Sequence, residues 1–305
     1  MLKGKILSPS STLGIVAPAS PEKYSSLRPS LNLLKCYFNN IKLGAHVLDR
    51  TGYLAGDDVN RANDINKMFL DDSIDGIICL RGGYGSIRTL SYINPDIIKC
   101  HPKFFCGFSD ITLLLNYFTS LGLITFHGPM INSNLIDSST LSSLIDISSC
   151  NTPNYTYDLT QFNDISYLNT NSFTGKLIGG NLSIICSSLK TPYEINASNS
   201  ILLLEEVNEE PYVLDRMLTQ LLYSDYFKSC RGIIVGHLDK QIIPNLSYKK
   251  KLQKVFIERL TPLNIPLIIG FPSGHDYPNL TLPIGSIVSF NPEEKKLIVK
   301  DNFLI

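Results

Sequence analysis

The stretch that decides the fold reads Lys103-Phe104-Phe105-Cys106-Gly107-Phe108-Ser109-Asp110. It joins a short apolar run, typical of a buried strand, to the segment Ile111–Leu121, whose apolar residues fall on one helical face. An earlier run, Asp75–Leu80, likewise stops at a glycine-rich turn, Arg81-Gly82-Gly83-Tyr84-Gly85, before a segment that favours a helix. Two successive strand-turn-helix joints predict a parallel sheet whose functional loops gather at the carboxyl ends of the strands.

The rest of the chain extends this pattern. Upstream, we expect a strand over Leu13–Ala17 and a helix within Ser30–Tyr37. Between about residues 132 and 172 the composition changes to Ser, Asn, Thr and Asp with little helical periodicity, which indicates a crossing between two domains. The second half predicts strands at Ile201–Leu204, Gly232–Val235 and Pro266–Ile269, a helix near Asp215–Tyr223, and antiparallel strands within Ile284–Ile305.

Composition narrows the class of partner. Among 305 residues, 27 Lys and Arg balance 27 Asp and Glu, so no strong field attracts nucleic acid or an anionic membrane, and a small partner is favoured. No apolar run approaches the ~20 residues of a membrane helix, and the N-terminal residues do not resemble a secretion signal. Seven cysteines without C-x-x-C spacing argue against a disulfide framework or a thiolate zinc site. We therefore expect an intracellular protein with reduced cysteines.

Ser109 is the candidate nucleophile. A serine hydroxyl needs a base to remove its proton and donors to stabilise the oxyanion that its attack creates. A serine between a strand and a helix N-terminus has the context of a nucleophile elbow, although the second glycine of G-x-S-x-G is absent and a plain helix N-cap is the alternative. The expected oxyanion hole uses the backbone amides of Gly82 or Gly83 and of Asp110; the alternative there is a tight or phosphate-binding turn.

Five histidines compete for the role of general base. His46 and His101 have no companion residues, His127 fits a cleft-lining and a structural role equally well, and His237, which follows a strand, is a credible rival. His275 is preferred, because it follows the apolar run Pro266–Ile269 inside a loop flanked by glycine.

A carboxylate is needed to orient such a histidine and to stabilise its protonated form. Glu205 and Glu206 follow the strand Ile201–Leu204, and because strand residues alternate in direction, one of them is expected to point into a site. The alternative is a solvated acidic turn. The order Ser109, Glu205, His275 matches one known order of serine, acid and histidine.

With these residues located, the chain resembles the LD-carboxypeptidase family. The resemblance keeps its order along nearly the whole chain, which independent chance matches would not do. It rests on these stretches: Gly14–Ser20, Arg81–Gly85, Gly107–Asp110, Thr125–Pro129, Gly179–Leu182, Leu204–Glu209 with Pro211 and Arg216, Gly274-His275 and Leu282–Gly285.

The resemblance implies a catalytic set of Ser109, Glu205 and His275, an oxyanion turn at Gly82-Gly83, and neither metal nor organic cofactor. It favours Glu205 over Glu206 as the catalytic acid. A familiar variant of this segment in the family reads Glu-Asp where this chain has Glu205-Glu206. The implied fold is α/β, with an N-terminal doubly wound, flavodoxin- or Rossmann-like parallel-sheet domain (1–150), a linker (151–172), and a mostly β, α+β C-terminal domain (173–305).

The resemblance also implies a cytoplasmic homodimer that removes the terminal D-alanine from murein tetrapeptide during peptidoglycan recycling. Relatives of the microcin C self-immunity peptidase, which cleave nucleotide conjugates, offer a second substrate class, and a non-catalytic ligand-binding protein is a third possibility. Arg81 and Tyr84 are candidates for substrate binding, as are Arg216 and Asn181. For Arg81, Arg216 and Asn181 the favoured alternative is a structural role in support of the domain interface.

Overall fold

The computed structural model describes residues 1–169, 171–239 and 246–305, and the chain divides into two compact units. Unit 1 comprises Met1–Asn151 together with two short returning segments, Leu280–Gly285 and Phe303–Ile305. Unit 2 comprises Thr152–Asn279 and Ser286–Asn302. The nucleophile candidate lies in unit 1, and the candidate base and acid lie in unit 2.

Unit 1 is built on a six-stranded sheet in the order β12-β5-β4-β3-β1-β2. Its first five strands in the chain are parallel, and β12 adds to β5 in the antiparallel direction. The order 2-1-3-4-5 is that of a doubly wound, flavodoxin-like sheet, as predicted. The strands are β1 (Thr12–Val16), β2 (Asn40–Leu43), β3 (Gly76–Cys79), β4 (Phe104–Gly107), β5 (Thr125–His127) and β12 (Leu282–Ile284).

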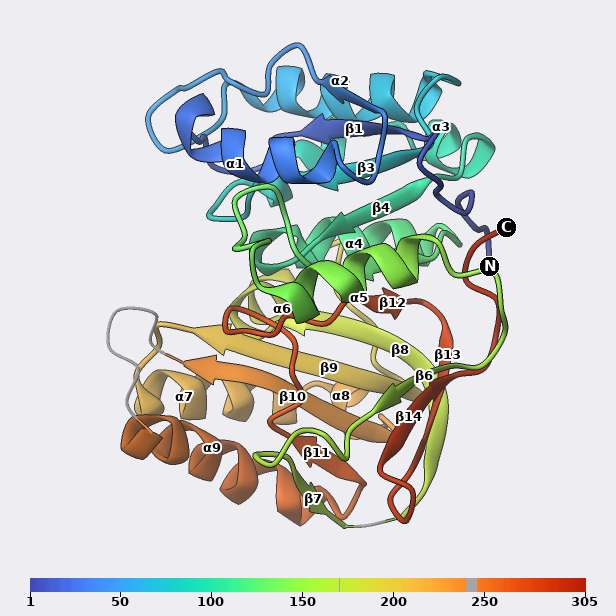
Figure 1. Ribbon diagram of the computed structural model, residues 1–305. Helices are drawn as coiled ribbons and strands as arrows, with labels where there is room; N and C mark the ends of the chain where they lie inside the picture. The colour runs from blue at the N-terminus through green and yellow to red at the C-terminus, as the bar shows by residue number, and fades with distance from the viewer. Residues whose placement is uncertain (170, 240–245) are drawn as a thin grey trace. The chain divides into compact units, whose positions relative to one another are not determined.

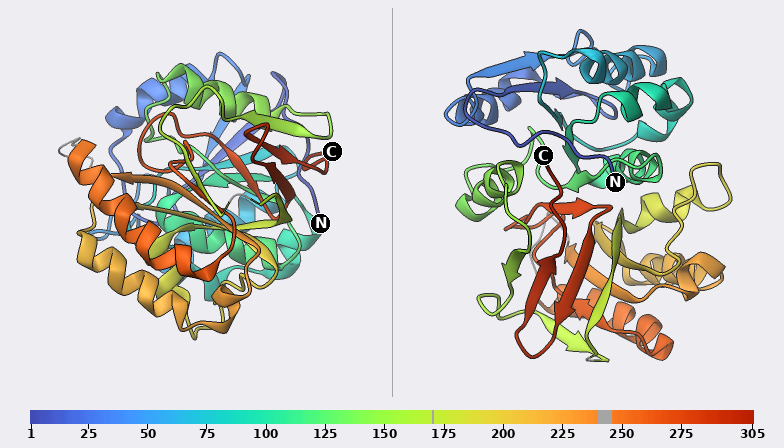
Figure 2. Two further views of the ribbon diagram at one scale, coloured as in Figure 1. Left: turned by 90° about the horizontal axis from the view of Figure 1, so that it is seen from below. Right: turned by 90° about the vertical axis from the view of Figure 1, so that its right-hand side faces the viewer.

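Helices cover both faces of this sheet (Figures 1 and 2). Coverage on both sides explains why β3 and β4 are buried at every position and read as continuous apolar runs. The helices are α1 (Tyr24–Leu34), α2 (Asp58–Leu70), α3 (Pro95–Cys100), α4 (Thr112–Ser120) and α5 (Ser138–Ser148), with 3-10 helices η1 (Ser86–Tyr92) and η2 (Ser109–Ile111).

Aromatic packing fixes β4 at the centre of unit 1. Phe104 stacks on Phe126 of β5 with ring centroids 4.3 Å apart. On the other face of the sheet, Phe105 meets Phe118 of α4 edge-to-face at 5.0 Å and stacks on Phe69 of α2 at 5.9 Å. Because consecutive strand residues anchor opposite faces, the strand that delivers Ser109 is held from both sides.

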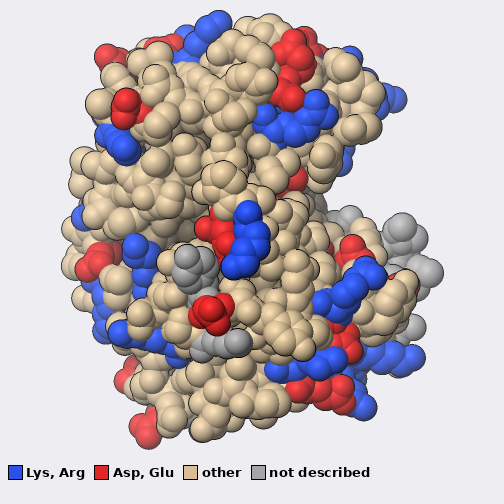
Figure 3. Space-filling view, turned by 180° about the vertical axis from the view of Figure 1, so that it is seen from behind, with Lys and Arg blue, Asp and Glu red and all other residues tan. Residues whose placement is uncertain are grey.

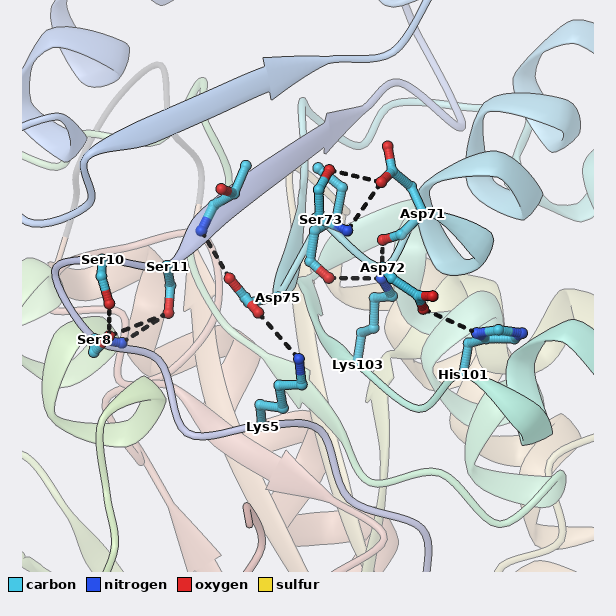
Figure 4. A network of polar contacts seen from close by, with 12 residues as sticks. Lys5, Ser8, Ser10, Ser11, Asp71, Asp72, Ser73, Asp75, His101 and Lys103 are labelled. Atoms are coloured by element: carbon cyan, nitrogen blue, oxygen red, sulfur yellow. Dashed lines mark hydrogen bonds and ion pairs between the residues drawn. The ribbon is translucent and has the colours of Figure 1, made fainter.

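A polar network braces the amino ends of these strands (Figure 4). The Lys103 ammonium is buried and donates to the carbonyls of Asp71, at 2.5 Å, and Ile74, at 2.6 Å. Asp75 accepts from the backbone N–H of Thr12 and pairs with Lys5 at 3.4 Å. This network ties together the loops that enter β1, β3 and β4.

Unit 2 holds an eight-stranded mixed sheet in the order β6-β14-β13-β8-β9-β10-β11-β7. Strands β8 to β11 run parallel, and the flanking pairs are antiparallel. The strands are β6 (Tyr155–Asp158), β7 (Ser166–Leu168), β8 (Phe173–Asn181), β9 (Ser200–Val207), β10 (Gly232–Asp239), β11 (Leu267–Ile269), β13 (Ile287–Asn291) and β14 (Lys296–Val299). The range expected as a linker, 151–172, thus contains β6 and β7.

Helices pack on one face of the parallel part of this sheet, where α7 and α9 lie side by side (Figure 1). Leu202 and Leu204 of β9 belong to the apolar core beneath these helices. Because strand residues alternate, Glu206 shares that face and Glu205 points to the opposite one. The helices are α6 (Leu182–Ser188), α7 (Pro211–Leu222), α8 (Asp225–Lys228), α9 (Leu246–Leu260) and the 3-10 helix η3 (Thr261–Leu263).

Two observations bear on partners. Lys and Arg are interspersed with Asp and Glu over the face drawn in Figure 3, in keeping with the balanced composition. Within the described residues, every helix is too short or too polar to span a bilayer.

Candidate active site

Ser109 occupies a sharp turn between β4 and η2. Its φ angle is +62°, in the left-handed region that residues other than glycine adopt rarely. The chain leaves β4, reverses at this residue and enters α4 after one 3-10 turn, and Ser109 remains partly exposed. A non-glycine residue held in this conformation at a strand-to-helix turn has the backbone of a nucleophile elbow.

Gly82 brings the glycine-rich turn against Ser109. A Cβ atom at Gly82 would lie 2.9 Å from the Cβ of Ser109, 3.0 Å from its Oγ, and 3.3 Å from the amide nitrogen of Asp110. Only a residue without a side chain permits this approach. The proximity puts the backbone of the turn beside both the hydroxyl and the amide that an oxyanion hole would use.

Asp110 joins the two turns. Its buried carboxylate accepts the backbone N–H of Ser86 at 2.8 Å and that of Gly85, while the Ser86 hydroxyl donates to the Asp110 carbonyl at 2.6 Å. Burial raises the pKa of Asp110, and these hydrogen bonds together with the Arg61 charge oppose that rise. The Asp110 carboxylate thus has a structural role, because it joins the two turns.

Arg61 of α2 is fully buried beside these turns. Its guanidinium donates to the carbonyl of Pro18 in the loop after β1 and to that of Gly85 at 2.9 Å. It also pairs with Asp58 on its own helix. One side chain therefore ties together the loops that follow β1 and β3, the two strands that flank the switch point of the sheet.

Sequence reasoning missed Arg61 and Ser86. The signal for Arg61 is its position: spacing from Ile65 and Met68 puts it on the apolar face of α2, where an arginine requires buried partners. Ser86 has no comparable signal, because its partners come from another loop.

The two residues proposed to bind substrate differ in their surroundings. Arg81 is half-buried and pairs with Glu22 at 3.0 Å. Tyr84 is 48% exposed, and its ring lies 5.7 Å from that of Tyr53, which is also exposed. The Tyr84 side chain is thus exposed beside a second exposed tyrosine, whereas the Arg81 charge is paired within unit 1.

His275 and Glu205 meet in unit 2. Nδ1 of His275 lies 2.7 Å from Oε2 of Glu205, whose side chain is completely buried. Gly274 allows the approach, since a Cβ atom there would lie 3.0 Å from the same carboxylate oxygen. The loop is held by Asn279, which accepts the backbone N–H of Gly274 at 2.9 Å. An Nδ1–H donated to the carboxylate places the basic lone pair of the imidazole on Nε2.

Opposing effects set the pKa of His275. Burial lowers it, but the charge of Glu205, its hydrogen bond and the charge of Glu206 together outweigh burial, so the pKa is raised above 6.5. The pair therefore stabilises the imidazolium that forms when a base takes a proton.

The remaining histidines have other roles. His237 is buried, its Nε2 lies 2.9 Å from the Pro278 carbonyl, and burial lowers its pKa. His127 is fully buried in β5, with its ring 5.9 Å from that of Phe108. His46 and His101 pair with carboxylates that are largely solvent-exposed. His275, by contrast, is oriented by a fully buried carboxylate, that of Glu205.

Asn181 and Arg216, the other two candidates for substrate binding, both lie in unit 2. Asn181 is buried and caps α6, so its amide serves the structure of unit 2. Arg216 lies on α7. Within the described ranges, no group of three or more His, Cys, Asp or Glu side chains is arranged to hold a metal ion.

Two family models match the chain, one on each half. The LD-carboxypeptidase N-terminal domain matches residues 13–128, and the LD-carboxypeptidase C-terminal domain matches residues 174–290. The chain is 33% identical over 303 residues to a probable murein peptide carboxypeptidase of Bacillus subtilis, covering 98% of this chain and 94% of the relative. It is 30% identical over 285 residues to the murein tetrapeptide carboxypeptidase of Pseudomonas aeruginosa, covering 90% and 91%.

Solved structures share the fold at lower identity. MccF in complex with glutamyl sulfamoyl guanosine superposes with a TM-score of 0.88 at 22% identity, and each chain is fully covered. A muramoyltetrapeptide carboxypeptidase from Oxalobacter formigenes superposes with a TM-score of 0.80 at 24% identity, covering 95% of this chain and 99% of the other. These likenesses establish the architecture of both units.

Proposed function

Because the chain belongs to the LD-carboxypeptidase family of serine peptidases, we propose that it hydrolyses the L,D-peptide bond to the terminal D-alanine of murein tetrapeptide in the cytoplasm. The substrate proposal draws on the relatives in Bacillus subtilis and Pseudomonas aeruginosa, which are named for murein peptides. Release of D-alanine from such a peptide is a step of peptidoglycan recycling.

In this proposal Ser109, His275 and Glu205 act as a triad. Nε2 of His275 takes the hydroxyl proton as Ser109 Oγ bonds to the scissile carbonyl carbon, and Glu205 stabilises the imidazolium. The tetrahedral intermediate collapses, His275 gives its proton to the leaving amine, and D-alanine departs. Water then attacks the acyl-enzyme with His275 again as base, which releases the shortened peptide and restores the serine.

The developing oxyanion needs donors that are already in place. The amide of Asp110 and the amide of Gly82 or Gly83 are the proposed donors, supported by the close approach of Gly82 to Ser109. The fixed loops contributed by Arg61 and Asp110 support the same role, since a hole assembled from two loops must hold its width.

The observation that carries the proposal is the backbone of Ser109. A serine that served only as a helix N-cap would have extended backbone angles. At +62° Ser109 departs from that geometry, and it is the first residue of η2, whose N-cap position is occupied by Phe108. A conformation this unfavourable at the carboxyl edge of a parallel sheet is what a displayed nucleophile requires.

Mass spectrometry of a defined L,D-linked tetrapeptide incubated with the purified protein provides the test. Loss of one alanine residue, abolished in Ser109→Ala, is the expected result. Intact peptide at high enzyme concentration would reject the murein assignment. Ser120→Ala is a matched control, because Ser120 is an exposed serine at the far end of α4.

A second substrate class is an aminoacyl-sulfamoyl nucleotide, the ligand type of the MccF structures. The chain contains no Trp to stack on a base, which favours the peptide. Turnover of both substrates side by side separates the two. Binding of either one without turnover, unchanged in Ser109→Ala, would instead identify a non-catalytic binding protein.

We also propose that the protein acts as a homodimer, as its family resemblance implies. Sedimentation velocity at several concentrations is the direct measurement, and a single monomeric species throughout would contradict it.

A further inference from the structure

Glu206 is a buried acid next to the catalytic glutamate, and the proposed reaction does not use it. Its side chain is 4% exposed and lies on the face of β9 opposite to Glu205. An acid buried in this way requires hydrogen-bond donors, and the structure provides three.

The donors come from two backbone amides and one side chain. Oε2 accepts the N–H of Ser183 in the first turn of α6 at 2.8 Å. Oε1 accepts from Nδ2 of Asn181 at 3.1 Å and from the N–H of Val207 at 2.9 Å. All three groups are donors only, so they stabilise the carboxylate form of Glu206 and oppose the effect of burial on its pKa.

Asn181 connects this carboxylate to the rest of unit 2. Its Oδ1 caps α6 by accepting the N–H of Ile184 at 3.2 Å and the hydroxyl of Ser183 at 2.7 Å. In the sheet, Asn181 is the register partner of Glu205. The end of β9 is therefore fastened to β8 and α6 at the point from which Glu205 reaches His275.

We infer that Glu206 is a positioning residue of the proposed reaction: held by Asn181 and α6, it fixes the end of β9 and adds a second negative charge behind the Glu205–His275 pair. The inference rests on the proposed function and extends it. Glu206 acts through its neighbours and touches neither Ser109 nor substrate in this role.

The titratable groups that interact with Glu206 are Glu205 on its own strand, Cys186 on α6, and His275 in the loop after β11. Burial, and secondly the charge of Glu205, raise the pKa of Glu206 to about 7. The charge of Glu206 in turn contributes to the raised pKa of His275. Glu206 thus becomes charged as the pH rises through neutrality, which is the pH range in which His275 would act as a base.

The test measures the pKa of the His275 imidazole directly, by NMR titration of the full-length protein, with His275→Gln to assign the signal. Glu206→Gln removes the charge and is expected to lower that pKa by about 0.5–1 unit. Glu206→Asp keeps the charge and is expected to leave it near the unmodified value. Glu293→Gln, at an exposed glutamate in the turn between β13 and β14, is the matched control and is expected to change nothing.

A variant that preserves Glu206 covers the case in which Glu206→Gln fails to fold. Asn181→Ser keeps an oxygen able to cap α6 but removes the amide that donates to Glu206, so a smaller decrease of the His275 pKa is expected. An unchanged pKa in the folded Glu206→Gln protein or in Asn181→Ser, or an equal decrease in Glu206→Asp and Glu206→Gln, overturns the inference.

The pH dependence of kcat/KM connects this result to catalysis. Its acidic limb is expected to move down with the His275 pKa in Glu206→Gln, whereas a merely structural role would lower the rate without moving the limb. Because the NMR titration needs no turnover, a protein inactive on both substrates refutes the proposed function while leaving the electrostatic role of Glu206 measurable.

Discussion

Gly82→Ala tests the oxyanion turn with the smallest possible change. The added methyl carbon would lie 2.9 Å from Cβ of Ser109, whereas ordinary van der Waals contact begins at 3.4 Å. Ser109 or the turn must therefore move by about 0.5 Å, and the methyl group also approaches the amide of Asp110 to 3.3 Å. The backbone angles at Gly82 are not in the left-handed region, so the backbone conformation itself does not exclude alanine, and the fold is expected to persist once the contact with Ser109 has relaxed.

The expected magnitude follows from two effects in the same place. Alanine keeps the backbone N–H, but displacing an oxyanion donor out of hydrogen-bond reach lowers kcat by up to roughly 10²–10³-fold, which corresponds to about 3–4 kcal/mol of transition-state stabilisation. Displacement of reacting groups by a fraction of an ångström adds to this loss. Because the perturbation concerns the transition state, kcat is expected to fall with little change in KM.

The assay is steady-state release of D-alanine from an L,D-linked tetrapeptide, together with thermal unfolding of each variant. Gly232→Ala is the matched control, because its methyl would meet only side-chain atoms of Phe173 and Ile201, at 3.3–3.4 Å, in the other unit. A Gly82→Ala protein that folds and retains kcat/KM within a factor of about three would refute the assignment of this turn to the oxyanion hole.

Three further predictions concern unit 2 and the amino edge of unit 1. Glu205→Gln is expected to lower kcat by about 10²–10⁴-fold. It should also move the acidic limb of the pH–rate profile to lower pH, because the charge that raises the pKa of His275 is lost. An acidic limb at the unmodified pH would contradict this role of Glu205. The pKa of Glu206 is raised from 4.5 to about 7, so the free energy of unfolding is expected to fall by about 3 kcal/mol as the pH rises through that window. Urea unfolding at pH 5 and pH 8 measures this fall, which should be smaller in Glu206→Gln than in the unmodified protein. Equal falls in the two proteins would exclude this role of Glu206. Lys103→Met removes the hydrogen-bond donor of two backbone carbonyls and is expected to reduce the free energy of unfolding by about 1–3 kcal/mol. Denaturant titration measures this loss, and turnover per folded molecule is expected to stay unchanged.

Strands buried on both faces were the predictable part of the fold. Asp75–Leu80 and Ile201–Leu204 are continuous apolar runs, and they correspond to β3 and β9 within a few residues. The turn at Ser109 was predictable for the same reason, since an apolar run that stops at glycine before a helical segment has few alternatives. The strand β9 extends through both glutamates, so they lie within the sheet and not in a turn after it.

Elements with polar surfaces were not predictable in the same way. The region 132–172 contains α5, β6 and β7, although its Ser- and Asn-rich composition indicated a crossing without helices. The helix expected within Ser30–Tyr37 begins earlier, at Tyr24, because Pro29 is tolerated inside it. At such positions tertiary packing decides the conformation and local propensity does not.

The candidate site shows the same division. Ser109, Glu205 and His275 were chosen from local patterns, but the choice of His275 over His237 needs the three-dimensional partners of each ring. The hydrogen bonds from Arg61 to Gly85 and from Ser86 to Asp110 each join residues that are 24 positions apart in sequence, which no local pattern reveals.

The left-handed backbone of Ser109 has a consequence for protein engineering. A side chain in this conformation carries a penalty of roughly 1–2 kcal/mol that glycine avoids. Glycine at position 109 should therefore raise the melting temperature while eliminating the reaction. Selection of this protein for heat tolerance alone would favour inactive variants at that position, so any thermostabilising library should leave it unvaried.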